Sequence, residues 1–136
     1  MLITRETDYA LRILRALADG EQLTTAELAH GEQIPQQFAY KILKKLQKNG
    51  IIKILRGTGG GCVLNTELKQ ISLYRLMQAM EGELTVNSCM NPDYVCNWCK
   101  AHEGVSCHAN VYLNFLQGRL DEELKAHNLQ EILFGK

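Results

Sequence analysis

Apolar residues recur at helical spacing in three stretches of the N-terminal half, and each stretch predicts an amphipathic helix. The first helix is expected to begin after Thr4, a favourable N-cap, and to end at Asp19-Gly20. Thr24 and Glu27 have the spacing of a capping box, so Thr24 should open a short second helix.

A third helix is expected from Pro35, which suits a first helical turn, to about Lys48, where Asn49-Gly50 gives a C-terminal signal. Its two faces differ in polarity. The apolar face, which should be buried, carries Phe38, Ile42, Leu43 and Leu46. Polar and basic residues occupy or adjoin the other face, namely Gln36, Gln37, Tyr40, Lys41, Lys44, Lys45 and Lys48.

Two short apolar runs, residues 51–55 and 62–64, follow this helix and are separated by the segment RGTGGG. Such runs around a glycine loop are typical of a β-hairpin. Two helices joined by a short turn and followed by a two-stranded ribbon form a winged helix-turn-helix, whose second helix reads the DNA major groove. The alternative is a small helical domain with an unrelated hairpin, but the basic residues fall on the two elements that would face DNA.

The C-terminal half predicts two further helices around an irregular segment. Ser72 can cap a helix that ends at Gly82, whereas residues 84–105 show no periodicity and are typical of a loop. A longer helix should extend from about Ser106 to His127. Its apolar stripe is wide and consists of Val111, Tyr112, Phe115, Leu116, Leu120 and Leu124. Little chain remains to cover this stripe, so we expect it to form a dimer interface, to pack on the winged domain, or both.

These elements predict a mainly α fold, a winged helix-turn-helix with a two-stranded β wing and a long C-terminal dimerisation helix. We expect a DNA-binding domain at residues 1–82, a cysteine-rich loop at 83–105, and the dimerisation helix with a C-terminal tail at 106–136. A chain of 136 residues suits one domain with an appended element.

The charge distribution favours a polyanionic partner for the N-terminal half. The formal net charge is zero, but residues 1–64 carry nine Lys and Arg against six Asp and Glu. Between Glu32 and Glu67 there are six bases and no acid. No apolar run is long enough to cross a bilayer, and the N-terminus lacks the form of a signal peptide, so we expect a cytoplasmic protein without a membrane partner.

Four of the five cysteines lie close together in the sequence, at Cys89, Cys96, Cys99 and Cys107. A reducing compartment disfavours a disulfide framework, so this density indicates a metal or redox role. Thiolates in a flexible loop can hold a soft metal or an iron–sulfur cluster. Cys96-x-x-Cys99 also suits structural zinc, completed by Cys89, Cys107 or His108, and a reversible thiol switch needs no metal. The fifth cysteine, Cys62, is expected to be a small buried apolar residue.

The order of these motifs resembles the Rrf-two family of bacterial regulators, which includes the IscR-type and NsrR-type proteins. The resemblance covers nearly the whole chain. It rests on the opening TRETDYALRIL, the LQKNG hinge with the RGTGGG wing tip, the helix ISLYRLMQAMEG and the cysteines that follow. It implies a homodimer that binds a pseudo-palindromic operator in double-stranded DNA. It also implies a repressor controlled by an iron–sulfur cluster, of two-iron or four-iron form, that senses redox state, nitric oxide or iron–sulfur status.

The resemblance also assigns DNA-binding roles to particular residues. The recognition helix would direct five side chains toward base edges and phosphates, those of Gln36, Gln37, Tyr40, Lys41 and Lys44. Arg56, Thr58 and Gly59 of the wing would reach the minor groove or the backbone. Gln can read adenine, while Lys neutralises phosphate and makes affinity depend on salt. Glycines 57 and 59–61 are expected to permit positive φ.

Cys89 and Cys107, at the two ends of the loop, are the first expected cluster ligands, and Cys99, Cys96 or both would add to them. The remaining ligand differs within the family. IscR-type proteins have a histidine three residues after the last cysteine, where this chain has Asn110. NsrR-type proteins use an aspartate in the first helix of the other subunit, which Asp8 matches. The alternative for Asp8 is a favourable charge at a helix N-terminus.

Two other classes of function remain open at this point. One is a winged-helix regulator with structural zinc or no metal, controlled by a small molecule, thiol oxidation or a partner protein. The other is an iron–sulfur or thiol oxidoreductase. The enzymatic alternative is disfavoured, because the sequence contains no recognisable nucleophile–base constellation, and we expect a protein that is not an enzyme.

Overall fold

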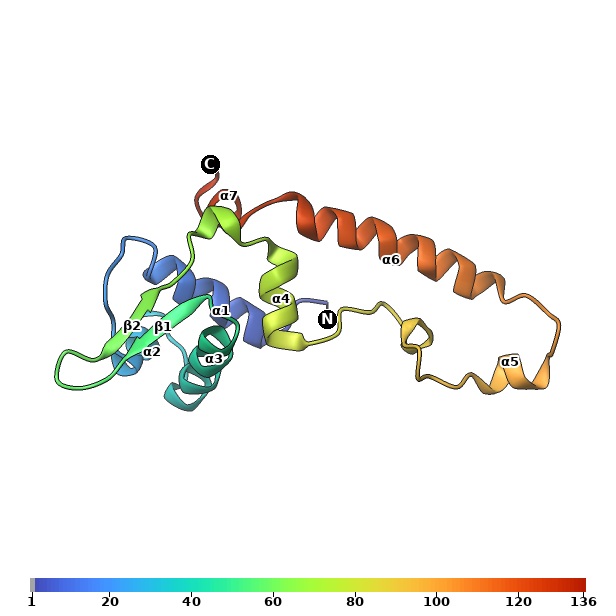
Figure 1. Ribbon diagram of the computed structural model, residues 1–136, viewed down its shortest axis with the longest axis horizontal. Coiled ribbons are helices and arrows are strands. Elements are labelled where there is room, and N and C mark those ends of the chain that lie inside the picture. Colours follow the sequence, from blue (N-terminus) through green and yellow to red (C-terminus); the bar gives the residue numbers. More distant parts are fainter. Residues whose placement is uncertain (1) are drawn as a thin grey trace.

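The computed structural model describes residues 2–136 and is mainly helical, with one two-stranded antiparallel sheet (Figure 1). In chain order its elements are α1 (Arg5–Ala16), α2 (Thr25–Gly31), α3 (Gln36–Lys48), β1 (Ile52–Leu55), β2 (Gly61–Leu64), η1 (Leu68–Gln70), α4 (Leu73–Glu81), η2 (Ser88–Met90), α5 (Asn97–Ala101), α6 (His108–Ala126) and α7 (Leu129–Phe134). This arrangement confirms the predicted fold class. Within residues 2–136, no helix combines the length and apolar character that a bilayer crossing requires.

The hydrophobic core lies where α1 packs against α3 and α4. Apolar residues at helical spacing on these three elements lose nearly all their exposure, and they include Ile13, Leu14, Leu17, Ile42, Leu43, Leu46 and Leu76. Burying one such side chain contributes about 1.5–3 kcal/mol. The core therefore fixes the position of α3, the expected recognition helix, relative to α1 and α4.

One buried position on α3 differs from the expectation. Phe38 was predicted to be buried, but its side chain is 41% exposed, and Ala39 occupies the buried position instead. Since α3 begins at Gln36 with Pro35 as its N-cap, the buried stripe falls on Ala39, Ile42, Leu43 and Leu46. The ring of Phe38 lies edge-on to Tyr9 of α1, with ring centroids 6.1 Å apart. Phe38 thus covers the outside of the α1–α3 contact.

The predicted capping box of α2 is present. Thr24 Oγ1 accepts a hydrogen bond from the Glu27 amide at 3.1 Å, and Glu27 Oε1 accepts one from the Thr24 amide at 3.2 Å. We expect Thr24→Ala to lower the free energy of unfolding by about 1 kcal/mol, because the Glu27 amide at the helix start loses its hydrogen-bond acceptor. Urea denaturation measures this change. Thr58→Ala, in the exposed wing loop, is the control, and an equal loss in both variants would contradict the role of the cap.

The wing is a short hairpin in which Ile52 pairs with Leu64 and Leu55 with Gly61. Leu23, which precedes α2, extends this sheet through two backbone hydrogen bonds with Cys62, at 3.2 and 2.7 Å. Gly61 has a φ of +144°, and a Cβ there would lie 2.9 Å from the Leu23 carbonyl oxygen. This close approach of two backbones requires glycine at position 61.

The expectation of positive φ holds for only part of the wing glycines. Gly57 has a φ of +96°, as expected, but Gly59 and Gly60 do not have positive φ, so the expectation was wrong for these two. Gly60 is required for space instead, because a Cβ there would lie 2.9 Å from the Gly57 carbonyl oxygen. The turn is closed by a 3.0 Å hydrogen bond from the Gly60 amide to that same oxygen.

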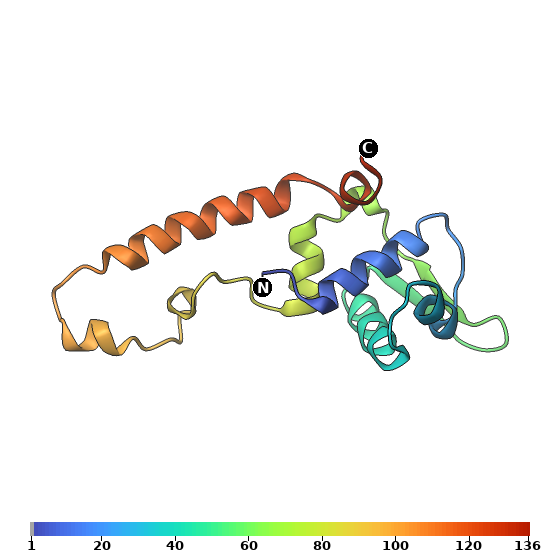
Figure 2. The ribbon, with the colours of Figure 1, turned by 180° about the vertical axis from the view of Figure 1, so that it is seen from behind.

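Residues 83–126 form an arm that extends away from the winged domain (Figures 1 and 2). The chain leaves α4 at Gly82, which has a φ of +81°. An irregular limb that includes η2 runs outward to α5 at the far end of the arm. The chain then returns to the winged domain as the long helix α6. Gln117 of α6 ties the two limbs together, since its amide donates to the Leu84 carbonyl at 2.7 Å and accepts from the Val86 amide at 2.8 Å. Residues 84–105 are largely irregular, as predicted, apart from η2 and α5.

The end of the chain returns to the winged domain through α7, which was not predicted from the sequence. Leu129 is fully buried, and its amide donates to the Ile71 carbonyl at 2.8 Å. Asn128 caps α7 by accepting from the Glu131 amide. The C-terminal end of α6 is therefore connected to a segment that is anchored on the winged domain.

Candidate DNA-binding surface and cysteine segment

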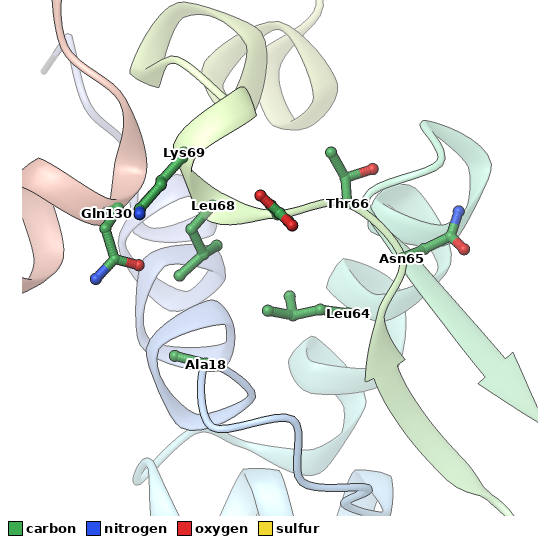
Figure 3. Close-up of a pocket in the computed structure, with 8 residues that line it drawn as sticks. Ala18, Leu64, Asn65, Thr66, Leu68, Lys69 and Gln130 are labelled. Carbon is green, nitrogen blue, oxygen red and sulfur yellow. The ribbon is translucent and has the colours of Figure 1, made fainter.

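All eight residues expected to contact DNA are exposed. Five lie on α3 and three in the wing loop, namely Gln36, Gln37, Tyr40, Lys41, Lys44, Arg56, Thr58 and Gly59. A hollow of about 470 Å³ elsewhere on the surface shares none of them. It lies between the wing base and α7, and Figure 3 shows Leu64, Leu68 and Gln130 along its wall. Thr66 at its edge is already hydrogen-bonded to the Gly50 carbonyl.

A groove between α3 and the wing brings part of the expected surface together. This α3–wing groove, of about 640 Å³, is lined by Tyr40, Lys44, Gln47, Lys48, Ile54 and Arg56. Its lining residues include three bases and no acid. The Lys44 ammonium lies 4.6 Å from the centre of the Tyr40 ring, so a cation–π contact holds it at the mouth of the groove. The groove therefore has the charge to bind a polyanionic backbone.

Two lining residues of the groove, Gln47 and Lys48, were not among the expected DNA contacts. Their signal in the sequence is their spacing, because residues three and four positions after Lys44 lie on the same side of a helix. Thr58 and Gly59 do not line the groove and lie at the wing tip. The Gly59 carbonyl accepts a hydrogen bond from the Gln22 side chain, which ties the wing tip to the segment before α2.

The other two lysines of α3 are engaged with α1. Glu6 pairs with Lys41 at 2.7 Å through one carboxylate oxygen and with Lys45 at 2.5 Å through the other. Hydrogen bonds from Lys41 and Lys45 lower the pKa of Glu6, so its carboxylate stays charged beside them. Lys45 also donates to the Met80 carbonyl at 2.8 Å. Lys41 keeps a 56% exposed side chain, whereas Lys45 is turned into the protein.

The four clustered cysteines form two pairs. Cys89 lies in η2 and Cys107 caps α6, and both thiols contact the same residue, Asn110. The Asn110 side-chain amide donates to Cys89 Sγ and its backbone amide donates to Cys107 Sγ, each at 3.4 Å. Asn110 stands where the IscR-type pattern has its histidine. It holds these two thiols next to each other, a role that the sequence did not predict.

Cys96 and Cys99 form the second pair, at the start of α5. The pKa of Cys96 is lowered by hydrogen bonds from the backbone and side chain of Cys99. The pKa of Cys99 is raised, first by its hydrogen bond to Cys96 and further by the charges of Cys107 and Cys89. Of the two thiols, Cys96 therefore has the lower pKa.

The donor set fits a soft metal or an iron–sulfur cluster in chemistry, because four thiols within one segment are the ligands these groups prefer. The two cysteine pairs do not, however, form a single metal-binding site in this conformation. Across residues 2–136, no three His, Cys, Asp or Glu side chains converge closely enough to hold a metal ion. To bind one metal or cluster with both pairs, the irregular segment that carries the exposed Cys99 would have to change conformation.

Asp8 lies on the first turns of α1, and its side chain is 50% exposed. Its carboxylate pairs with Arg12 at 2.8 Å within the same helix. The cysteine pairs of its own chain belong to the arm, and Asp8 is not brought to them. Cys62 is 2% exposed, as expected of a buried apolar residue, and burial raises the pKa of its thiol.

Comparisons with known proteins agree with this architecture. Residues 3–134 match the Rrf2 family, described as an iron-dependent transcriptional regulator. Protein aau3 of Rhizobium meliloti is 27% identical over 142 residues, covering 99% of this chain and 92% of that protein. The HTH-type transcriptional repressor NsrR of Streptomyces coelicolor is 38% identical over 93 residues, covering 65% of this chain and 63% of the repressor.

The fold is shared with a solved regulator. CymR (YrzC), the global cysteine regulator of B. subtilis, superposes with a TM-score of 0.74 at 20% identity, covering 98% of this chain and 97% of that chain. Likeness at this identity concerns the fold alone. The relatives with assigned roles are transcriptional regulators and not enzymes. A family match that spans nearly the whole chain shows that this protein belongs to the Rrf2 family of transcriptional regulators.

Proposed function

We propose that this protein is a cytoplasmic, homodimeric repressor whose affinity for a pseudo-palindromic operator is controlled by an iron–sulfur cluster bound in the arm. The observation that carries the proposal is the pairing of two features on one chain. One is the basic α3–wing groove, and the other is an arm with four free cysteines, two of which contact the same residue, Asn110.

The DNA-binding step follows from the groove. Gln36 and Gln37, exposed at the start of α3, are placed to read base edges, because the first turns of a recognition helix enter the major groove. Lys44, Lys48 and Arg56 neutralise phosphates along the groove. Thr58 and Gly59 extend the contact at the wing tip, and Lys41 adds a charge that it shares with Glu6.

The dimer follows from the arm. Its long helix presents Val111, Tyr112 and Phe115 to solvent, each more than 60% exposed. Neighbouring apolar side chains of this size that are exposed on a single chain mark a surface that a partner covers. A second copy gives each half of a palindromic operator its own recognition helix, since protein and operator then share a two-fold axis.

The cluster would be held by Cys89 and Cys107 together with Cys99, Cys96 or both, and by Asp8 of the other subunit. When bound, it supplies chemistry that responds to redox state, nitric oxide or iron–sulfur supply. The pairing of Asp8 with Arg12, at 2.8 Å, uses Asp8 Oδ2, so Oδ1 is the oxygen that would bind the cluster without breaking this pair. A ligand from the other subunit would link the geometry of the dimer to the state of the cysteine segment.

The test is purification without oxygen, followed by the visible spectrum and analysis of iron, sulfide and zinc. We expect a brown wild-type protein with stoichiometric iron and sulfide, and a weakened or altered spectrum for Asp8→Ala. Asp19→Ala, which removes an acid just beyond the other end of α1, is the matched control and should keep the wild-type spectrum. A colourless wild-type protein with one zinc per chain would contradict the sensing mechanism.

The Cys96–Cys99 pair favours a second candidate function. Cys96 is the N-cap of α5 and Cys99 lies within this helix, and two thiols at this spacing suit structural zinc or reversible oxidation. In that case the protein is a winged-helix regulator controlled by thiol oxidation, a small molecule or a partner protein. The same metal analysis separates the two functions, because only the first gives iron with acid-labile sulfide.

A further inference from the structure

Three helix ends meet at one junction beside the core. The start of α1 contributes Glu6 and Thr7, α3 contributes Lys45, and the last turn of α4 contributes Met80 and Glu81. Lys45 donates to the Glu6 carboxylate at 2.5 Å and to the Met80 carbonyl at 2.8 Å. Glu81 accepts hydrogen bonds from the hydroxyl groups of Thr4 and, at 3.0 Å, Thr7.

We propose that Lys45 is a positioning residue that couples the recognition helix to the state of the cysteine segment. This inference rests on the proposed function and adds the path by which the arm acts on α3. Lys45 was grouped by sequence with the basic face of α3, but in the structure it points toward α1 and α4.

The path runs through the end of α4. The carbonyl that Lys45 binds belongs to Met80, in the last turn of α4, and the chain turns at Gly82 into the cysteine segment. A shift of that segment therefore moves an atom to which α3 is directly bonded. Thr7 is fully buried and fastens the neighbouring Glu81 to α1, so the end of α4 cannot shift without disturbing α1 as well.

The same junction adjoins Asp8, the residue after Thr7. The start of α1 thus carries both Asp8, which would bind the cluster of the other subunit, and Glu6, which binds Lys45 of α3. Lys44, one position earlier than Lys45, lies in the α3–wing groove instead. The two neighbouring lysines should therefore have opposite roles, one in DNA contact and one in coupling.

The experiment compares Lys45→Met with Lys44→Met on a duplex that the wild-type protein selects from a random-sequence pool. Affinity is measured with cluster-loaded and cluster-free protein, and the cluster-free affinity is measured across a range of salt concentrations. The ratio of the cluster-loaded affinity to the cluster-free affinity is the coupling ratio. The slope of the logarithm of affinity against the logarithm of salt concentration, called the salt slope, reports the number of phosphate contacts. Thr7→Val, which removes one hydroxyl from the junction and leaves α3 unchanged, is judged by the same two measurements.

We expect Lys45→Met to lower the coupling ratio at least about fivefold while its salt slope stays that of the wild type. Lys44→Met should keep the ratio and make the salt slope less steep by about 0.9. Thr7→Val should lower the ratio with an unchanged slope.

A Lys45→Met or Thr7→Val variant that keeps the wild-type ratio would overturn the inference, as would a salt slope for Lys45→Met like that of Lys44→Met. A coupling ratio of one for the wild-type protein would mean that the cluster has no effect on DNA binding. It would overturn the proposed sensing function, and the inference with it.

Discussion

Replacing Phe115 by aspartate is expected to convert the protein to a monomer and to lower its affinity for a palindromic operator on the order of 100-fold or more. Phe115 is 61% exposed at the middle of α6, between Tyr112 and the guanidinium of Arg119. A carboxylate at this position would have to be desolvated in the dimer without a partner, which costs several kcal/mol. Each monomer would then hold only one half of the operator.

Light scattering measures the mass of the variant, and titration with the selected duplex measures its affinity. Phe134→Asp is the matched control, since Phe134 is also exposed, at 40%, but lies on α7. It should remain dimeric. If Phe115→Asp keeps the dimeric mass and the wild-type affinity, the exposed stripe of α6 does not form the interface.

Cys107→Ser is expected to remove nearly all bound iron and sulfide and to make operator affinity independent of cluster assembly. Cys107 is held at the N-cap of α6, where the Asn110 backbone amide donates to its sulfur while the Asn110 side chain contacts Cys89. The hydroxyl of serine is a harder and far less acidic ligand than a thiol, and it binds iron in a cluster poorly.

Iron and sulfide analysis after anaerobic purification checks this prediction. Cys62→Ala is the control, because Cys62 is buried in the wing and remote from the other thiols along the chain. It should keep the wild-type iron content. A Cys107→Ser protein with wild-type iron and colour would exclude Cys107 as a ligand.

The sequence predicted the elements that depend on local signals. The cap at Thr24 was identified from Glu27 three residues later and the cap at Ser72 from its residue type, and both are present. Phe38 was placed on the wrong face because the buried stripe of α3 is set by its contact with α1, which periodicity alone does not define to one residue. The short helix α7 was missed because its position depends on Leu129 packing against a distant segment.

The site divides in the same way. Exposure of the expected DNA contacts follows from helix periodicity and from the glycine-rich wing, and the structure bears out that exposure. Lys45 could not be separated from Lys44 by sequence, because its partner Glu6 is 39 residues away. Likewise, Asn110 was recognised only as a missing histidine, whereas its contacts with two thiols appear only in three dimensions.

The arm has a consequence for the fate of a newly made chain. Within the described chain, Leu124 is the one residue of α6 that is buried, so the rest of the helix gains little from its own winged domain. In the proposed dimer, most of the stability of the arm would come from association, and it would depend by mass action on the concentration of the protein in the cell. At low copy number the arm opens locally and is accessible to proteases, so degradation would remove unpaired chains first. The protein would then accumulate only above the concentration at which it dimerises, whatever the state of the cysteines.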